Sequence, residues 1–157
     1  MKTLYLVACA KLKLQGRHPA QELYCSDLFK KSRAYVASQL QAGDGWLILS
    51  AKHGVLYPDE SVLSYDLAIK DLSDFERAAW AQSVWRDCLF DYFDPFGREG
   101  FRRLVFLAGA RYQVPLRAAI AFSACASVVI EDPLQGLEIG QRLSWLKANT
   151  PQQARPA

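Results

Sequence analysis

The sequence predicts an α/β fold: a three-layer α/β/α arrangement built on a mostly parallel central sheet of four or more strands. Two observations lead to this prediction. Short apolar segments alternate along the chain with longer segments of helical spacing, which is typical of repeated β-α units. In addition, polar and cationic residues follow these apolar segments at equivalent places, as expected where parallel strands end on one edge of a sheet.

The first strand and the first long helix come from the N-terminal third. Residues 1–8 form an apolar run that suits a buried strand and is too short for an export signal. Ser26 is placed to cap a helix that continues to about Gln41, and Asp27 in its first turn suits the positive end of the helix dipole. This part of the chain therefore predicts one β-α unit.

The second strand is predicted at Trp46–Leu49, an apolar run that follows two glycines. The hydroxyl of Ser50, the cation of Lys52 and the imidazole of His53 follow within four residues of its end. Gly54 is expected to turn the backbone sharply there, and Pro58 to keep the next segment extended. An ordinary polar loop would give the same pattern, so the other strand ends have to decide whether a site lies here.

The C-terminal half repeats the alternation. A capping box at Ser73–Glu76 is predicted to begin a helix that continues to Tyr92, with Phe75 on its apolar surface. Strands are predicted at Arg103–Ala108 and Cys125–Ile130. Helices are predicted near Val114–Phe122, with Pro115 in the first turn, and at Leu137–Asn149, with Ile139, Leu143 and Leu146 facing inward.

Length and composition limit the class of protein. The chain has 157 residues, of which 51% are hydrophobic, so it can bury a core of its own. We expect one domain at residues 1–149 and a disordered, Pro/Gln-rich tail at 150–157. The apolar runs are far shorter than a membrane span, so we expect a cytoplasmic protein without membrane contact.

No metal and no cofactor is expected. The four cysteines form no C-x-x-C pair and only two histidines accompany them, which favours reduced thiols over a zinc site. Neither a G-x-G-x-x-G segment nor a P-loop is present, which argues against dinucleotide and nucleoside-triphosphate chemistry. The G-x-S-x-G elbow of serine hydrolases is also missing.

Positive charge is concentrated in the first third of the chain. Residues 1–55 carry eight Lys/Arg against three Asp/Glu, a net charge of +5, whereas the remainder carries eleven against thirteen, a net charge of −2. This asymmetry indicates an anionic partner such as phosphate or nucleic acid, with chance clustering as the competing explanation.

Three predicted strand ends meet on one edge if the sheet is parallel. Because three equivalent polar clusters are harder to dismiss than one, we expect a common pocket at this edge. The residues predicted to line it are Cys9, Lys11, Lys13, Tyr24, Ser26, Ser50, Tyr65, Gly109 and Tyr112.

Asp66 is the carboxylate of greatest interest, because the extended segment after Pro58 can fold it back over this edge. Cleavage of an N-glycosidic bond builds positive charge on the sugar, and a carboxylate can stabilise that charge or orient water. Lys52 and His53 would contact the leaving base or a flanking phosphate, so these three are the candidate catalytic residues. Other roles stay open: Asp66 as a helix cap, Cys9 as a nucleophile or a packing residue, and Lys52 as a Schiff-base amine.

Four segments together resemble a small bacterial and phage domain family. They are Cys9-Ala10-Lys11-x-Lys13, Glu22-Leu23-Tyr24-x-Ser26-x-x-Phe29, Ile48-Leu49-Ser50-Ala51-Lys52-His53-Gly54-Val55-Leu56-x-Pro58 with Tyr65-Asp66, and Pro133-Leu134-x-Gly136-Leu137-x-Ile139-Gly140-x-x-Leu143-x-Trp145-Leu146. The match covers nearly the whole chain. The family is distantly similar to the YaaA-like peroxide-stress proteins, and the archaeosine synthase group resembles it in the Cys/Lys motif at the strand end.

The resemblance implies base chemistry directed at nucleic acid, and we expect this chemistry to proceed without a metal or nucleotide cofactor. Within such a family we expect an anti-phage DNA glycosylase that removes a hypermodified base, such as glucosylated hydroxymethylcytosine, from phage DNA and leaves an abasic site. A flipped base would enter the strand-end cleft, and the basic edge would bind phosphate. Two alternatives stay open: a transferase that modifies a 7-deazaguanine-type base, and a non-catalytic DNA-binding module of the YaaA-like kind.

Overall fold

Five strands form the central sheet in a computed structural model that describes residues 1–93, 100–123 and 128–152. They are β1 (Thr3–Ala8), β3 (Gly45–Ser50), β4 (Gly54–Leu56), β6 (Arg103–Leu107) and β7 (Val129–Glu131), in the order β4-β3-β1-β6-β7. All neighbouring strands are parallel except β3 and β4. The predicted α/β class and the mostly parallel sheet are therefore confirmed.

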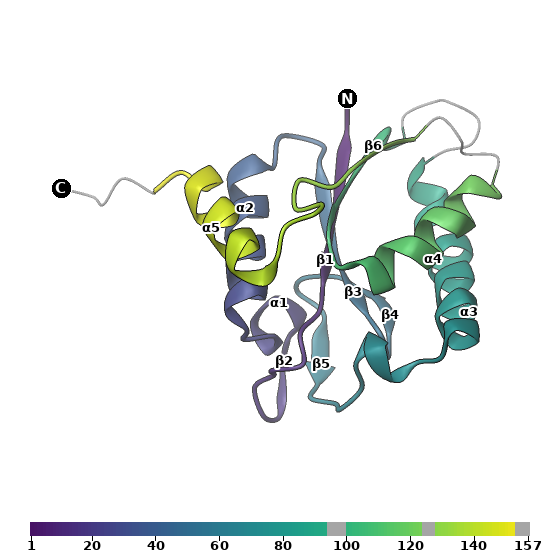
Figure 1. Cartoon of the computed structure of the whole chain (residues 1–157), viewed down its shortest axis with the longest axis horizontal. Helices are drawn as coiled ribbons and strands as arrows, with labels where there is room; N and C mark the ends of the chain where they lie inside the picture. The colour runs from purple at the N-terminus through teal and green to yellow at the C-terminus, as the bar shows by residue number, and fades with distance from the viewer. Residues whose placement is uncertain (94–99, 124–127, 153–157) are drawn as a thin grey trace.

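Helices cover both faces of the sheet (Figure 1). On one face α2 (Asp27–Gln39) packs beside α5 (Ile139–Asn149), and on the other α3 (Asp74–Val84) packs beside α4 (Ala110–Ala121). The predicted cap of α2 is confirmed, because Ser26 Oγ accepts a hydrogen bond from the N–H of Phe29 at 3.1 Å. These two helical layers complete the α/β/α arrangement.

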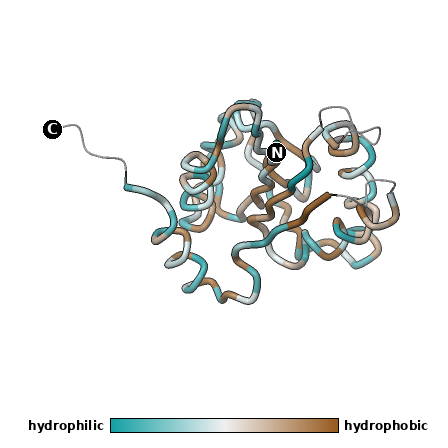
Figure 2. Tube along the Cα trace, turned by 90° about the horizontal axis from the view of Figure 1, so that it is seen from above, coloured by the Kyte–Doolittle hydropathy of each residue, from teal (hydrophilic) through white to brown (hydrophobic). Residues whose placement is uncertain are grey.

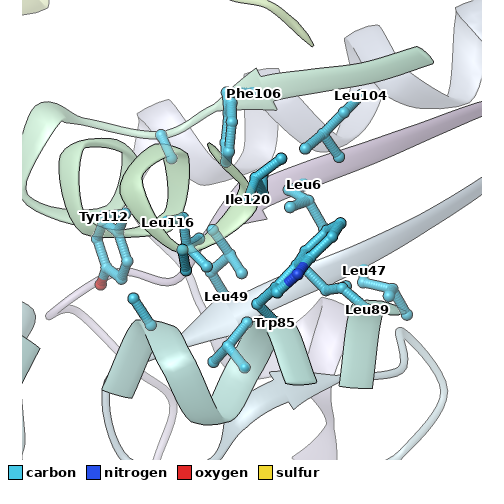
Figure 3. Packing of buried hydrophobic residues seen from close by; sticks show 14 of the residues in the cluster. Leu6, Leu47, Leu49, Trp85, Leu89, Leu104, Phe106, Tyr112, Leu116 and Ile120 are labelled. Carbon is cyan, nitrogen blue, oxygen red and sulfur yellow. The ribbon is translucent and has the colours of Figure 1, made fainter. Parts of the chain in front are cut away.

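The strands serve two cores because their side chains alternate between the faces. In β1, Leu4 and Leu6 pack toward α3 and α4, whereas Tyr5 and Val7 pack toward α2 and α5. Figure 3 shows the first core, where Trp85 and the apolar residues of α4 lie against leucines of the sheet. Seen from above, the hydrophobic strands run through the middle of the molecule (Figure 2). Burial on both faces explains the near-continuous apolar runs of the strand sequences.

A second, two-stranded sheet lies beyond the carboxyl end of β1. It pairs β2 (Arg17–Pro19) antiparallel with β5 (Ser61–Leu63), and the single turn α1 (Ala20–Leu23) follows β2. The N–H of Ser64 also donates to the carbonyl of Gly16 at 2.9 Å. This small sheet therefore holds the segment that carries Tyr65 and Asp66 against the segment that follows β1.

Neither β4 nor this second sheet was predicted from the sequence. Each of these strands has three residues, which is too short for a pattern of alternation to be recognised. Gly54 does turn the chain with a φ of 76°, as predicted, but the turn leads into an antiparallel strand rather than an irregular loop.

The prediction for α4 was wrong at its start. The helix begins at Ala110 and not near Val114, so Pro115 lies inside the helix rather than in its first turn. A proline there costs one backbone hydrogen bond, yet the surrounding burial of Tyr112, Leu116 and Ile120 keeps the segment helical.

The predicted helix from the capping box to Tyr92 is helical throughout but not uniform. The box itself is confirmed, because Ser73 Oγ accepts from the N–H of Glu76 at 3.1 Å. The α-helix ends at Val84, and a π-helical turn (Trp85–Leu89) and a 3-10 turn (Phe90–Phe93) follow. A π turn rotates the chain relative to α-helical spacing, so the periodicity of the sequence does not continue through it.

Two residues predicted to face inward are exposed. Phe75 is 84% exposed and Ile139 is 60% exposed. Both belong to the first turn of their helices, α3 and α5. Helix α5 itself begins at Ile139 rather than Leu137.

Two further predictions extend beyond the described residues. Of the strand predicted at Cys125–Ile130, residues 125–127 lie outside the described ranges, and β7 covers Val129–Glu131. Of the predicted disordered tail, residues 153–157 lie outside them, whereas Thr150 Oγ1 donates to the carbonyl of Leu146 at 2.7 Å. None of the helices within residues 1–93, 100–123 and 128–152 is both long and apolar enough to cross a membrane.

Candidate functional site

Buried hydroxyl groups meet at the carboxyl edge of the sheet, with Tyr65 at their centre. The Tyr65 hydroxyl lies 2.7 Å from Ser50 Oγ and 2.6 Å from the Tyr24 hydroxyl. Ser50 Oγ also accepts a hydrogen bond from the N–H of His53 at 3.1 Å. Three hydroxyls from the end of β3, the segment after α1 and the segment after β5 are thus joined in one chain of hydrogen bonds.

Cys9, which follows β1, and Tyr112 of α4 continue this layer toward the core on the α3/α4 face of the sheet. Their Sγ and hydroxyl oxygen lie 3.1 Å apart in a hydrogen bond, and the N–H of Cys9 donates to the carbonyl of Leu49 at 2.8 Å. Figure 3 shows the Tyr112 hydroxyl at the border of the apolar core. We use the name "floor" for the following set: Cys9, Tyr24, Ser50, Tyr65 and Tyr112.

Trp80 of α3 joins the two halves of the floor. Its Nε1 donates to the carbonyl of Ser50 at 3.0 Å, and its ring meets the ring of Tyr112 edge to face at 5.6 Å. The sequence predicted Trp80 only as part of the apolar surface of a helix. Tryptophan presents an N–H as well as an apolar ring, and only the tertiary arrangement shows which of the two is used.

Burial determines the protonation of the floor phenols. It raises the pKa of Tyr24 to about 12, and it also raises the pKa values of Tyr65 and Tyr112, where the neighbouring Cys9 acts in the same direction. At neutral pH these groups are therefore neutral hydrogen-bonding partners and not bases.

Charged and titratable side chains surround the exposed part of Tyr65. Lys13 Nζ lies 4.5 Å and Lys52 Nζ 5.6 Å from the centroid of its ring, and the ring of His53 meets it edge to face at 5.2 Å. Lys52 and His53 come from the turn between β3 and β4 and are exposed. We use the name "rim" for the following set: Lys11, Lys13, Lys52, His53 and Asp66.

Two rim residues have lowered pKa values. Partial burial lowers the pKa of His53 and the charge of Lys52 lowers it further, against the opposing charge of Glu60, so the imidazole is less readily protonated than a free one. Burial also lowers the pKa of Lys13; Lys11 adds to this effect, whereas Cys9 and Asp66 oppose it. His53 therefore suits hydrogen bonding better than permanent binding of phosphate.

Two cavities open beside the floor. The first, which we call the carboxylate cavity, has a volume of about 640 Å³ and is lined by Lys11, Lys13, Tyr65 and Asp66 together with Leu12, Gln15 and Ser64. Asp66 is exposed there, and its position next to the two lysines follows from the pairing of β2 with β5.

The second cavity lies between the carboxyl ends of β1 and β6 and has a volume of about 370 Å³. The chain leaves β1 through α2 toward β3, while β6 lies on the opposite side of β1, so this is the point where the strand order reverses. Ligands of open α/β sheets bind in such a crevice. We call it the switch-point cavity, and its polar or small lining residues include Cys9, Lys11, Ser26, Ser32, Gly109 and Arg142.

The structure brings the predicted site residues to one edge, but in different layers. Tyr24, Ser50 and Tyr112 are buried, so they support the cavity walls from below and do not face an open space. Ser26 and Gly109 border the switch-point cavity, and Asp66 borders the carboxylate cavity.

Arg142 of α5 was not predicted to belong to the site. Its Nε donates to the carbonyl of Leu137 at 2.8 Å, which holds the guanidinium beside the switch-point cavity. No motif in the sequence marks this arginine, because its place depends on how α5 packs beside α2.

In the part of the chain that the structure describes, no three His, Cys, Asp or Glu side chains group closely enough to hold a metal ion. The site instead consists of phenols, a thiol, lysines, a neutral imidazole and one carboxylate. Such a set can bind anions, stack against planar groups and stabilise a developing positive charge.

Fold and site together define an α/β/α domain with a polar, cation-rich edge at the carboxyl ends of its parallel strands. Residues 4–148 match the model of a family of unknown function, DUF6884, and the chain belongs to this family. It is 30% identical over 127 residues to the uncharacterized protein YfjM of Bacillus subtilis (strain 168), a match that covers 76% of this chain and 78% of that protein.

Among solved structures, the chain is similar to AF0587, a protein of unknown function, with 16% sequence identity and a TM-score of 0.46. The match covers 99% of this chain but 46% of the solved chain, so the chain spans less than half the length of that protein. The relationship to YaaA-like proteins and to archaeosine synthase stays a prediction.

Proposed function

We propose that this protein is a DNA N-glycosylase of the cytoplasm that removes a hypermodified base, such as glucosylated hydroxymethylcytosine, from phage DNA and leaves an abasic site. The observation that carries the proposal is the position of Asp66: its carboxylate lines one cavity with Lys11 and Lys13. This combination offers an anion for a cationic sugar and cations for its phosphates.

Asp66 has the role of stabilising the sugar cation or orienting the attacking water. Glycosidic cleavage passes through a transition state in which positive charge develops at C1′, and a nearby carboxylate lowers its energy. Lys11 and Lys13 bind the phosphates on either side of the flipped nucleotide, because backbone charge supplies most of the affinity for DNA.

The leaving base needs a pocket of its own. A volume of about 370 Å³ places the switch-point cavity within the range of about 300–1,000 Å³ typical of small-molecule sites. Its lining is largely apolar, and Cys9, Ser26 and Arg142 provide polar groups for the edge of a base or its substituent.

Lys52 and His53, which contact the Tyr65 ring from the turn after β3, are assigned to the stabilisation of the departing base. Because the pKa of His53 is lowered, its neutral ring can donate or accept a hydrogen bond as negative charge develops on the base. Lys52 remains the cation of this pair and also contacts a flanking phosphate.

The test uses the full chain and phage DNA that carries glucosylated hydroxymethylcytosine. We expect release of the modified base, detected by mass spectrometry, together with strand breaks that appear only after chemical cleavage at abasic sites. Asp66→Asn abolishes both signals, whereas Asp59→Asn, an exposed carboxylate in the turn before β5, serves as the matched control and retains them.

Other outcomes contradict the proposal. A base of altered mass that stays attached to its sugar would instead indicate a transferase for 7-deazaguanine-type bases. Binding of modified DNA without base release from any substrate would indicate a DNA-binding module. Circular dichroism of the Asp66→Asn variant shows whether the variant is still folded, so that a loss of activity can be distinguished from a loss of structure.

A further inference from the structure

We infer that Lys13 is an amine nucleophile that condenses with the C1′ aldehyde of an abasic deoxyribose and so gives the protein a strand-cleaving lyase activity. The inference rests on the proposed function for its class of substrate. It assigns to Lys13 a role for which the sequence alone favoured Lys52.

The position of Lys13 distinguishes it from the other lysines of the rim. Its Nζ lies 4.5 Å from the centroid of the Tyr65 ring and 5.8 Å from that of the Tyr24 ring, and it donates to the carbonyl of Lys11 at 3.2 Å. Lys11 and Lys52 are exposed, whereas Lys13 is half-buried. The amine is thus held by two aromatic rings at the wall of the carboxylate cavity.

The surroundings of Lys13 lower the pKa of its ammonium group, so this lysine gives up its proton more easily than an exposed lysine does. Lys13 takes part in none of the ion pairs found within the described ranges. Burial lowers its pKa, and the like charge of Lys11 acts in the same direction against the opposing effects of Cys9 and Asp66. Desolvation and a cationic neighbour are the two ordinary means of activating a lysine toward carbonyl groups.

Asp66 provides the base that the lyase step requires. Its carboxylate lines the same cavity as the amine, so both can reach one sugar. An abasic deoxyribose in its open form presents the aldehyde carbon C1′ next to an acidic C2′–H. A site with one amine and one carboxylate therefore matches both reacting positions of this sugar.

The chemistry proceeds in two steps. The lone pair of the neutral Lys13 amine forms the N–C1′ bond, the nitrogen gives a proton to the carbonyl oxygen, and a further proton from solvent lets that oxygen leave as water. The product is a protonated Schiff base. Asp66 then takes the proton from C2′, the electrons of that C–H bond form the C2′=C3′ double bond, and the 3′ phosphate leaves with the electron pair of the C3′–O bond. Water finally hydrolyses the Schiff base and restores the amine.

The experiment starts from a labelled oligonucleotide that already contains an abasic site, so it does not depend on base removal. The full chain is incubated with this DNA and sodium cyanoborohydride, which reduces a Schiff base to a stable cross-link. We expect a protein–DNA adduct on a denaturing gel, and peptide mapping of the wild-type adduct places the DNA on Lys13.

Two variants sharpen this test. Lys13→Arg keeps the positive charge but removes the nucleophilic amine, so the adduct falls to the level given by heat-denatured protein. Lys147→Gln also removes a lysine, in the exposed last turn of α5, and leaves the yield unchanged. Melting curves of both variants verify that they are folded.

Absence of a wild-type adduct, or an adduct mapped to Lys11, Lys52 or the N-terminal amine, overturns the inference. These results leave the glycosylase proposal intact, because base release from modified DNA is measured separately. Conversely, an adduct at Lys13 without base release would support the lyase and contradict the glycosylase.

Discussion

The floor of the site consists of hydroxyl and thiol side chains and the rim of charged or titratable ones, and the two sets are held in different ways. In the floor, Ser50 is 0% and Tyr24 1% exposed, and their hydroxyls are joined through Tyr65. In the rim, Lys52, His53 and Asp66 are exposed. Buried polar groups must find protein partners, whereas exposed ones are free to bind a ligand. The floor therefore stabilises the fold, and the rim is available for chemistry.

Removal of the central hydroxyl should have the largest effect on stability. Tyr65→Phe leaves Ser50 and the Tyr24 hydroxyl without their shared partner, so we expect the free energy of unfolding to fall by about 1–3 kcal/mol. Urea denaturation measures this change. Tyr57→Phe is the matched control, because the exposed Tyr57 hydroxyl bonds only at the surface with Tyr92, and its loss should cost clearly less. Equal losses in the two variants would argue against a structural floor.

Alkaline pH should weaken the protein through the same hydroxyls. The unfolded chain releases phenol protons near the ordinary pKa of 10.0, whereas the floor phenols keep theirs because their pKa values are raised, to about 12 for Tyr24. The unfolded state then binds fewer protons, so stability falls as the pH rises above about 10. Melting temperatures between pH 8 and 11 measure the slope, which Tyr65→Phe should reduce. If the melting temperature falls equally with pH in the wild-type protein and in Tyr65→Phe, the alkaline loss of stability does not come from the floor phenols.

Rim substitutions should act on activity and hardly on stability. Asp66→Asn and Lys52→Gln are expected to change the free energy of unfolding by no more than about 0.5 kcal/mol, because both side chains are exposed. Asp66→Asn should nevertheless lower the rate of base release by about 100-fold or more. Urea denaturation and base-release kinetics on the same samples make the comparison. A large loss of stability in Asp66→Asn would show that Asp66 supports the fold, as the floor residues do.

The smallest expected effect concerns His53. Partial burial and the charge of Lys52 lower its pKa from the ordinary 6.5, against the opposing charge of Glu60, so the unfolded chain takes up a proton at a higher pH than the folded chain. Its contribution to stability is therefore complete above pH 6.5 and is lost as the pH falls through the folded pKa. The NMR titration of the ring measures this pKa, and Lys52→Gln should raise it. A value that does not respond to Lys52→Gln would contradict the proposed coupling.

Long, regular segments were predictable because their signals are local. The apolar runs of β1, β3 and β6 and the side-chain caps at Ser26 and Ser73 depend only on neighbouring residues, and the structure confirms them. The convergence of strand ends followed from the parallel topology. What could not be predicted depends on pairing between distant segments, as in the sheet that places Tyr65 beside Lys13.

The division between floor and rim was equally hidden in the sequence. Ser50 and Lys52 stand two positions apart after the same strand, and both are polar. Ser50 lies within β3 and is enclosed by Trp80 and Tyr65, whereas Lys52 lies in the turn beyond the last strand pair. A polar residue at a strand end thus indicates the edge of the sheet, but only packing decides whether it meets a ligand.

The antiparallel return of β4 has a mechanical consequence. Because Ser50 pairs with Gly54 across the ladder, the turn between them is closed at its base and cannot swing as a free loop would. Lys52 and His53 therefore lie in a short turn that is fixed at both ends, and their distance from the sheet depends on the number of residues in this turn. One residue added there would lift both side chains away from Tyr65 while leaving every strand of the sheet intact.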